Sequence, residues 1–364
     1  MNRKSFVAFV VVSLILVAAI FTLVLSMGEK ETVQETKVGL VLPGSVNEPG
    51  WNGDHYRGVL DASKELGFDL MLAENAKEFT GSCERSVDSL VQAGAKLVIL
   101  GSFNYPQEIE SYIQNHPDVM FFGVSSGLAL KNFNVYSARV YQARFMAGVI
   151  AALVSKNGKL GYVAAMNNSE VNRGINAFAL GARKVNPKAK VFVRWTNSWD
   201  DVAVETTNVE RLVKDAGIDV VAYHQNKTAV VEAAIAQGIS VVGYNLTGQS
   251  FAPNVVGVLS TNWKMVYMDF IRDFIQKKSS VSNYWVGIEK GAVEISYLSS
   301  ALDDSSKQVV NGFVEQMKNG MSIFVGPLHD NANKKRCEKD EHLSDEILRS
   351  GMDWFVDGVY VYEE

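Results

Sequence analysis

Strand-like and helix-like patterns alternate along most of this chain, and the series occurs twice. Short apolar runs are separated by amphipathic segments of about 10–15 residues, a spacing typical of parallel sheets built from βαβ units. The first series covers residues 37–124, and the second starts at residue 141. Two series of similar size predict an α/β protein with two lobes of one architecture and a cleft between them.

The individual elements follow from apolar periodicity and from stop signals such as Gly67. Strands are predicted over residues 37–42, 69–73, 95–100, 118–124, 159–165, 189–195, 218–223, 239–244 and 255–260. Helices are predicted over residues 52–66, 81–93, 106–115, 141–155, 169–184, 203–215, 228–237, 263–277, 304–319 and 343–353. The segment 285–296 is predicted to be an edge hairpin.

Composition excludes several classes of protein. A length of 364 residues predicts about two domains. The net charge is −5 and Lys and Arg form no stripe, which argues against a nucleic-acid partner. Cys83 and Cys337 have no second Cys or His at metal-ligand spacing, so neither a metal nor another cofactor is predicted. Two separate thiols are favoured over a disulfide, which an exported location would permit.

The N-terminal segment predicts export. Arg3 and Lys4 precede residues 6–27, which carry no charge. This stretch is long enough to span a bilayer, for which about 20 residues suffice, so both an uncleaved membrane anchor and a cleaved signal are retained. No Cys occurs before Cys83, which leaves no site for a lipoprotein anchor. In either case the chain beyond the polar linker at residues 28–36 is expected on the extracytoplasmic face.

Aromatic residues stand where the predicted strands give way to loops, close to Asn, Asp or Gln. They are Trp51, Phe103, Tyr105, Trp195, Trp199 and Tyr223. In an open parallel sheet, ligands bind outside the carboxyl ends of the strands. Aromatic faces flanked by amides and carboxylates suit a flat ligand with polar edges, such as a nucleobase.

In the first half, the loop at residues 43–52 lacks the glycine patterns that cradle phosphates. It offers instead the aromatic face of Trp51 and the amide of Asn52, although Asn52 could also be an ordinary helix cap. The loop at residues 101–106 offers Phe103 or Tyr105 as a cover for a ligand. Alternatively, its aromatics only seat the following helix.

In the second half, residues 195–201 combine two Trp with Asn and two Asp. Trp199 could stack on a base, and Asp200 could read the edge of that base or form part of a solvated loop or helix cap. Asn226 follows a later strand, and an Asn amide can pair with adenine through N6 and N7. The neighbouring His224 is interpreted as structural.

One motif points to an enzyme. Residues 123–127 match G-x-S-x-G, with Ser125 as the candidate nucleophile. That motif requires a strand, a turn and then a helix, whereas here the chain leads into another strand-like run. No catalytic residue is therefore predicted.

Several segments resemble the basic membrane protein family of ABC-transporter substrate-binding proteins, most of all its purine-binding branch. The segments are KVGLVLP at 37–43, VYQARFMAG at 140–148, GYVAA at 161–165, RGINAFALGARKVNP at 173–187, WTNSWD at 195–200 and MDWFVDGV at 352–359. The resemblance implies a type I periplasmic-binding fold: two Rossmann-like lobes with parallel sheets, joined by a multi-strand hinge. It also implies closure on a purine stacked between Trp51 and Trp199.

The resemblance further implies a monomer that captures a purine base, adenine-like, and delivers it to an ABC permease. Expected lobe boundaries are 37–138 with about 262–283 for lobe one, and 139–261 with about 284–364 for lobe two. Two departures keep alternatives open. Asn226 replaces an Asp that reads the base, and Asn245 replaces an Asp that holds ribose in nucleoside-binding members. The first departure leaves the preferred base open, and the second weakens a nucleoside receptor as an alternative without excluding it. An anchored sensor without transport is the other alternative, which retention of residues 6–27 would favour.

Overall fold

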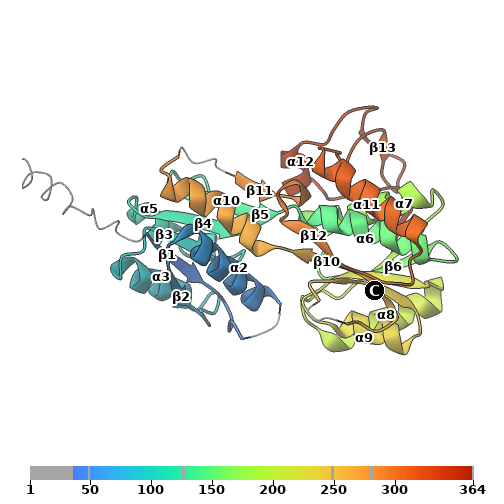
Figure 1. Ribbon diagram of the computed structural model, residues 1–364, viewed down its shortest axis with the longest axis horizontal. Coiled ribbons are helices and arrows are strands. Elements are labelled where there is room, and N and C mark those ends of the chain that lie inside the picture. The colour runs from blue at the N-terminus through green and yellow to red at the C-terminus, as the bar shows by residue number, and fades with distance from the viewer. Residues whose placement is uncertain (1–35, 48–49, 125–127, 247–249, 279–282, 363–364) are drawn as a thin grey trace, which may run out of the picture. The chain divides into compact units, whose positions relative to one another are not determined.

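The computed structural model describes residues 36–47, 50–124, 128–246, 250–278 and 283–362 (Figure 1). Residues 37–364 form one compact unit. Within the described residues the chain builds two large sheets and one two-stranded sheet, and helices cover both faces of each large sheet. The predicted α/β architecture with parallel sheets is confirmed.

The first sheet has six parallel strands in the order β11-β5-β4-β3-β1-β2. Its strands are β1 (Lys37–Val41), β2 (Asp69–Ala73), β3 (Leu97–Leu100), β4 (Met120–Val124), β5 (Phe133–Ala138) and β11 (Asn283–Val286). One face packs against α2 (Trp51–Leu66) and α10 (Trp263–Ile275). The other packs against α3 (Ser82–Gln92), α4 (Tyr105–Glu108) and α5 (Glu110–Asn115).

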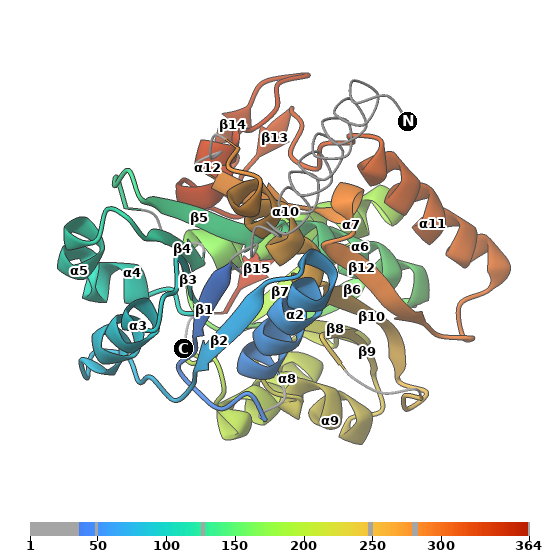
Figure 2. The ribbon, with the colours of Figure 1, turned by 60° about the vertical axis from the view of Figure 1, so that its left-hand side comes forward.

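The second sheet has seven strands in the order β12-β10-β9-β8-β6-β7-β15, and only β12 runs antiparallel to its neighbour. They are β6 (Lys159–Ala164), β7 (Lys190–Trp195), β8 (Val220–His224), β9 (Ser240–Tyr244), β10 (Val255–Thr261), β12 (Val293–Leu298) and β15 (Val359–Val361). Helices α6 (Val140–Val154) and α7 (Ser169–Val185) cover one face. Helices α8 (Val202–Ala216) and α9 (Ala229–Ala236) cover the other (Figure 2).

The chain passes between the two sheets three times. It leaves the first sheet after β5 and continues into α6, it returns after β10 into α10, and it leaves again after β11. The short 3-10 helix η1 (Ile288–Lys290) and then β12 follow this last passage. Three connections of this kind match the multi-strand hinge that the sequence resemblance implies.

The C-terminal part adds α11 (Asp304–Lys318), the two-stranded sheet of β13 (Leu328–His329) and β14 (Lys335–Cys337), and α12 (Asp345–Ser350). Side chains from α11 and α12 join the core around α6 and α7. The final strand, β15, pairs with β7 at the edge of the second sheet. This segment is therefore part of the packed unit.

Two sequence predictions are wrong in detail. The segment 285–296 is not a hairpin, because β11 pairs with β5 in the first sheet and β12 pairs with β10 in the second. A strand run alone does not say which partner a strand takes, and here the chain changes sheets between the two strands. The helix predicted over 106–115 is two short helices separated at Ile109.

Two other features were open or undetected in the sequence. Strand β5 was noted only as a strand-like run without bounds, because its buried residues include Asn134 and Ser137 and form neither a continuous apolar run nor a clear alternation. Cys83 and Cys337 are both free and buried in different hydrophobic clusters, which confirms the interpretation as two separate thiols.

No helix among the described residues is both long and apolar enough to cross a bilayer. The uncharged stretch at residues 6–27, for which an anchor or a signal was predicted, lies outside the described residues. Ser125 of the G-x-S-x-G match also lies outside them. Because that match begins in β4 and the next described strand is β5, the described residues around it supply no helix.

Candidate functional site

Trp51 stands at the first position of α2, beyond the carboxyl end of β1, and is half-buried. Its indole Nε1 donates to the carbonyl oxygen of Gly101, which follows β3, at 2.8 Å. The residue before it, Gly50, has φ 92°, a backbone conformation that favours glycine. A side chain at Gly50 would lie 3.6 Å from the carbonyl oxygen of Asn226. Trp51 is therefore held at a strand end, next to the loop that carries Asn226.

A buried aromatic cluster packs against the indole of Trp51. The ring of His55 contacts those of Trp51 and Trp263, with centroid distances of 4.1 and 3.9 Å, and the two indoles also contact each other at 5.6 Å. Nδ1 of His55 is hydrogen-bonded to the hydroxyl of Tyr267. Burial lowers the pKa of His55 to about 3, so the ring is neutral at physiological pH. A neutral ring can pack under an indole without the cost of burying a charge.

In the second sheet, Trp199 lies in the loop between β7 and α8 and is half-buried. Its carbonyl oxygen accepts a hydrogen bond from the backbone N–H of Asn226 at 2.8 Å. The side chain of Gln225 is hydrogen-bonded to the hydroxyl of Thr196 at 2.8 Å. These two bonds fasten the loop after β7 to the loop after β8, so the backbone around Trp199 is held in place before any ligand binds.

The other predicted polar residues have distinct environments. Asp200 is exposed, and its carboxylate accepts a 3.4 Å bond from the hydroxyl of Ser198. Asp201 caps α8 by accepting from the N–H of Val204, so one of the two acids is the predicted helix cap. Asn226 is exposed, and its backbone is bonded to that of Trp199, while Oδ1 of Asn52 accepts from the N–H of Gly44 at 3.3 Å. Asn52 is not the cap of α2, because that helix begins one residue earlier.

Half of the strand-end aromatics belong to the core. Tyr105 and Tyr223 are at most 1% exposed, and Trp195 is 9% exposed. The hydroxyl of Tyr105 is hydrogen-bonded to the carbonyl of Ala76, and that of Tyr223 to the backbone of Tyr244. Tyr105 and Tyr223 pack the sheets and are unavailable to a ligand, whereas Trp195 is largely buried but also lines a cavity at the end of β7. Phe103, in contrast, is 55% exposed and stays a candidate cover.

Asn245 has a structural role that explains its side chain. It follows β9 with φ 52°, a conformation that Asn tolerates better than most residues. Its Oδ1 accepts from the N–H of Thr261 at 2.9 Å, and its own N–H donates to Leu259. The amide thus joins β9 to the end of β10.

Sequence reasoning missed a buried polar cluster beneath the strand ends of the second sheet. Arg144, on α6, is 3% exposed, and its Nη1 donates to the carbonyl oxygen of Tyr223 at 3.0 Å. Its guanidinium lies 3.8 Å from the ring centre of Tyr244. Its Nε and Nη2, the hydroxyl of Tyr162 and Nδ1 of His224 are buried without a partner among the described residues. The only sequence feature that could have revealed this cluster is Arg144, a charged residue within an otherwise apolar helix.

Comparison with known proteins places the chain in a family. Residues 35–325 match the sequence profile described as ABC transporter substrate-binding protein, PnrA-like. The chain belongs to this family. Its members are extracytoplasmic, non-catalytic receptors that bind a small molecule and deliver it to an ABC permease.

Relatives of this substrate-binding protein carry different ligand names. A purine-binding protein of Brucella abortus is 30% identical over 91% of this chain and 95% of its own length. A putative ABC transporter glucose-binding protein of Haloferax volcanii is 28% identical over 91% of this chain and 81% of its own length. The two names agree on the family and do not identify the ligand of this chain.

Solved structures share the fold. A transcriptional activator of the comK gene from Bacillus halodurans aligns with a TM-score of 0.69 at 21% identity, covering 78% of this chain and 98% of that one. A solute-binding protein from Aeropyrum pernix aligns with a TM-score of 0.65 at 16% identity, covering 80% and 94%. The type I periplasmic-binding fold expected from the sequence is therefore confirmed.

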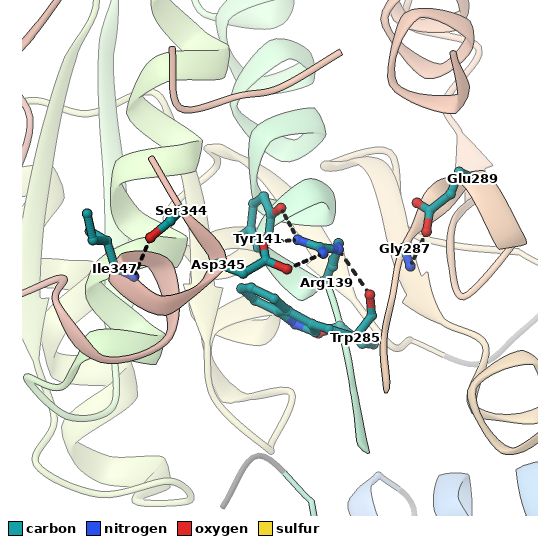
Figure 3. Close-up of polar contacts among 9 residues, drawn as sticks. Arg139, Tyr141, Trp285, Gly287, Glu289, Ser344, Asp345 and Ile347 are labelled. Carbon is teal, nitrogen blue, oxygen red and sulfur yellow. Dashed lines mark hydrogen bonds and ion pairs between the residues drawn. The ribbon is translucent and has the colours of Figure 1, made fainter. Parts of the chain in front are cut away.

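The connection between β5 and α6 is anchored in this substrate-binding protein by its C-terminal part (Figure 3). Arg139 forms a two-pronged ion pair with Asp345 of α12, with distances of 2.8 and 2.6 Å. Its Nε donates to the carbonyl oxygen of Trp285 at 3.0 Å, and its guanidinium lies 4.4 Å from the centre of the indole. Arg139 directly follows β5, and Trp285 lies in β11. The contact between them therefore joins two of the three connections between the sheets.

Two cavities stand out among the described residues, and neither is lined by the predicted ligand residues. One of about 340 Å³ lies at Arg139, Trp285 and α12. One of about 760 Å³ lies between the end of β7 and the C-terminal strand. No group of three or more potential metal ligands occurs among the described residues. The candidate site therefore rests on the side chains at the strand ends.

Glu205, in α8, makes the stability of this protein depend on pH. It is fully buried, and neither carboxylate oxygen has a partner among the described residues. Burial, with the nearby charges of Asp200 and Asp201, raises its pKa from 4.5 to about 7, although Lys227 opposes the shift. The folded state therefore holds this proton more tightly. The contribution of this proton to the free energy of unfolding is fully present below pH 4.5 and is lost as the pH rises through about 7.

Glu205→Gln removes this titration. The difference in free energy of unfolding between the variant and the unmodified protein should therefore shift in favour of the variant by about 3 kcal/mol between pH 4.5 and pH 8. Denaturant unfolding of both proteins at several pH values between 4.5 and 8 measures the difference. Glu210→Gln, on the exposed side of the same helix, is the matched control and should not change the pH dependence. Parallel pH curves for Glu205→Gln and the unmodified protein would contradict the assignment.

Proposed function

We propose that this substrate-binding protein captures a purine base at the strand ends of its two sheets and passes it to an ABC importer. The supporting observation is a pair of positioned indoles, one from each sheet. Trp51 is fixed by its bond to Gly101 and by the ring of His55, and Trp199 stands on the fastened loops after β7 and β8. Stacking on such faces contributes about 1–3 kcal/mol per base.

The residues around these indoles suit the edges of a base. Asn226 and Asp200 expose an amide and a carboxylate beside Trp199, and Asn52 neighbours Trp51. An Asn amide can pair with adenine through N6 and N7, which supports an adenine-like base as the specific ligand. Phe103 completes the proposed set as an exposed cover.

Asn245 supports a free base over a nucleoside. Its Oδ1 already accepts from Thr261, so this side chain offers a ribose at most one further acceptor site besides its amide N–H groups. A carboxylate at this position could accept bonds from two hydroxyls, and Asn245 cannot. We therefore propose that adenosine binds more weakly than adenine.

Calorimetric titration of residues 37–364, unfolded and refolded to remove carried ligand, tests the proposal. Adenine, guanine, hypoxanthine and adenosine are added in turn, together with glucose because a relative carries that name. Binding of a free base in preference to adenosine supports the proposed function. A preference for adenosine would make the protein a nucleoside receptor, and binding of glucose alone would refute the purine assignment.

The proposal includes the organisation of the whole chain. Lobe one comprises residues 37–138 with about 262–283, and lobe two residues 139–261 with about 284–364. The protein acts as a monomer, and residues 6–27 hold it at the membrane or are removed as a signal. Mass spectrometry of the exported protein distinguishes these two fates by the presence or absence of those residues.

A further inference from the structure

His224 joins the buried polar cluster to Trp199 of the candidate site. It is the last residue of β8 and is half-buried. Its ring stands edge-on to that of Trp199, with centroids 5.5 Å apart and planes at 70°. Nδ1 is buried and unpartnered among the described residues, whereas Nε2 is not among the buried atoms without a partner. Nδ1 thus faces inward, and Nε2 lies on the side that solvent reaches.

The surroundings of Nδ1 are cationic. A Cβ added at Gly174 of α7 would be 3.7 Å from Nδ1 of His224, 3.6 Å from the hydroxyl of Tyr162 and 3.4 Å from Cγ of Arg144, so these three side chains share one space. Arg144 makes no ion pair there, because its Nη1 bonds to Tyr223 and its other nitrogens have no partner among the described residues. The charge of Arg144 therefore acts on the ring of His224 without a compensating carboxylate in contact with it.

These charges select one form of the histidine. Burial, then Arg144, then Arg173 of α7 lower the pKa of His224 well below its usual value, so the ring is neutral at physiological pH. In a neutral imidazole one nitrogen carries the proton and the other has a lone pair. A cation on the Nδ1 side repels an N–H dipole and attracts a lone pair. This field favours the tautomer with the proton on Nε2.

We propose that His224 is a specificity-determining residue whose fixed Nε2–H donates a hydrogen bond to an acceptor on the base stacked against Trp199, and that Arg144 is the positioning residue that sets this tautomer. The ligand class is thereby restricted to flat heterocycles with a ring nitrogen or carbonyl oxygen at the edge facing β8. This inference rests on the proposed function, because it assumes that the base lies on Trp199.

The tautomer is tested without any ligand. Two-bond ¹H–¹⁵N correlation spectra distinguish the Nδ1–H and Nε2–H forms of neutral histidine, and the spectrum of His224→Gln identifies the signals of residue 224 among the five histidines. We expect a single Nε2–H form between pH 6 and 8. Arg144→Lys should retain it, whereas Arg144→Met should yield a mixture. An Nδ1–H form in the unmodified protein would overturn the inference, whatever the protein binds.

The hydrogen bond to the ligand is tested by pairing protein variants with deaza analogues of the base. In each analogue one ring nitrogen becomes C–H, which removes a single acceptor. We expect one of 1-, 3- and 7-deazaadenine to bind roughly five- to ten-fold more weakly than adenine to the unmodified protein. His224→Leu should bind this analogue and adenine with the same affinity. His224→Gln, which can present an N–H at a similar place, should restore part of the penalty.

The exposed His342 provides the matched control, and His342→Leu should keep every penalty of the unmodified protein. If the bases bind and each deaza penalty is the same with Leu as with His at 224, the inference fails while the proposed function stands. If no base binds, the proposed function fails, and the tautomer experiment still decides the role of Arg144.

Discussion

Replacing Trp51 and Trp199 together with alanine is expected to abolish measurable binding of the purine base. Each substitution alone should weaken binding by about 5- to 150-fold, because stacking on one aromatic face contributes about 1–3 kcal/mol. The two residues belong to different sheets, and the described residues show no ring contact between them, so the double variant loses two separate contacts with the base and should bind more weakly than either single variant. Calorimetry with the preferred base from the ligand series measures all three variants.

Phenylalanine separates stacking from the other contacts of Trp51. Trp51→Phe keeps an aromatic face but loses the bond from Nε1 to Gly101, so it should retain most of the affinity. Phe79→Ala removes an aromatic that is 73% exposed on the same half of the chain and should change nothing. Full affinity in Trp199→Ala would remove that residue from the site. A loss in Phe79→Ala equal to that in Trp51→Ala would show that the effect is not specific.

Gly148→Ala is expected to destabilise the protein by about 4 kcal/mol or more. Helices α6 and α7 approach so closely that a Cβ at Gly148 would lie 2.0 Å from the carbonyl oxygen of Phe178. The contact is reciprocal, since a Cβ at Gly181 would lie 2.0 Å from the carbonyl oxygen of Phe145. A backbone atom cannot turn aside as a side chain can, so the two helices must separate within a close-packed core.

Denaturant unfolding of the variant and of Gly312→Ala measures this effect. Gly312 lies within α11, and a Cβ there meets nothing within 4 Å. The same chemical change should therefore stabilise the protein by up to about 1 kcal/mol through helix propensity. Equal effects of the two substitutions would mean that the α6–α7 contact is not close-packed.

The sequence predicted the positions of the strand-end aromatics better than it predicted their exposure. Trp51 and Trp199 lie beyond the ends of β1 and β7, as expected from the aliphatic runs before them. The same rule failed for Tyr105, Trp195 and Tyr223, which are buried. An aromatic at a strand end can turn toward the ligand side or toward the core, and the local sequence is nearly the same in both cases.

By itself, the sequence determined the alternation of strands and helices and the parallel sheets. These follow from local periodicity and from the geometry common to parallel strands. Only the tertiary structure decided that β11 and β12 join different sheets, and that Arg144 lies beneath His224. Pairing of distant strands and burial of a charge depend on contacts between residues far apart in the chain. No local pattern encodes those contacts.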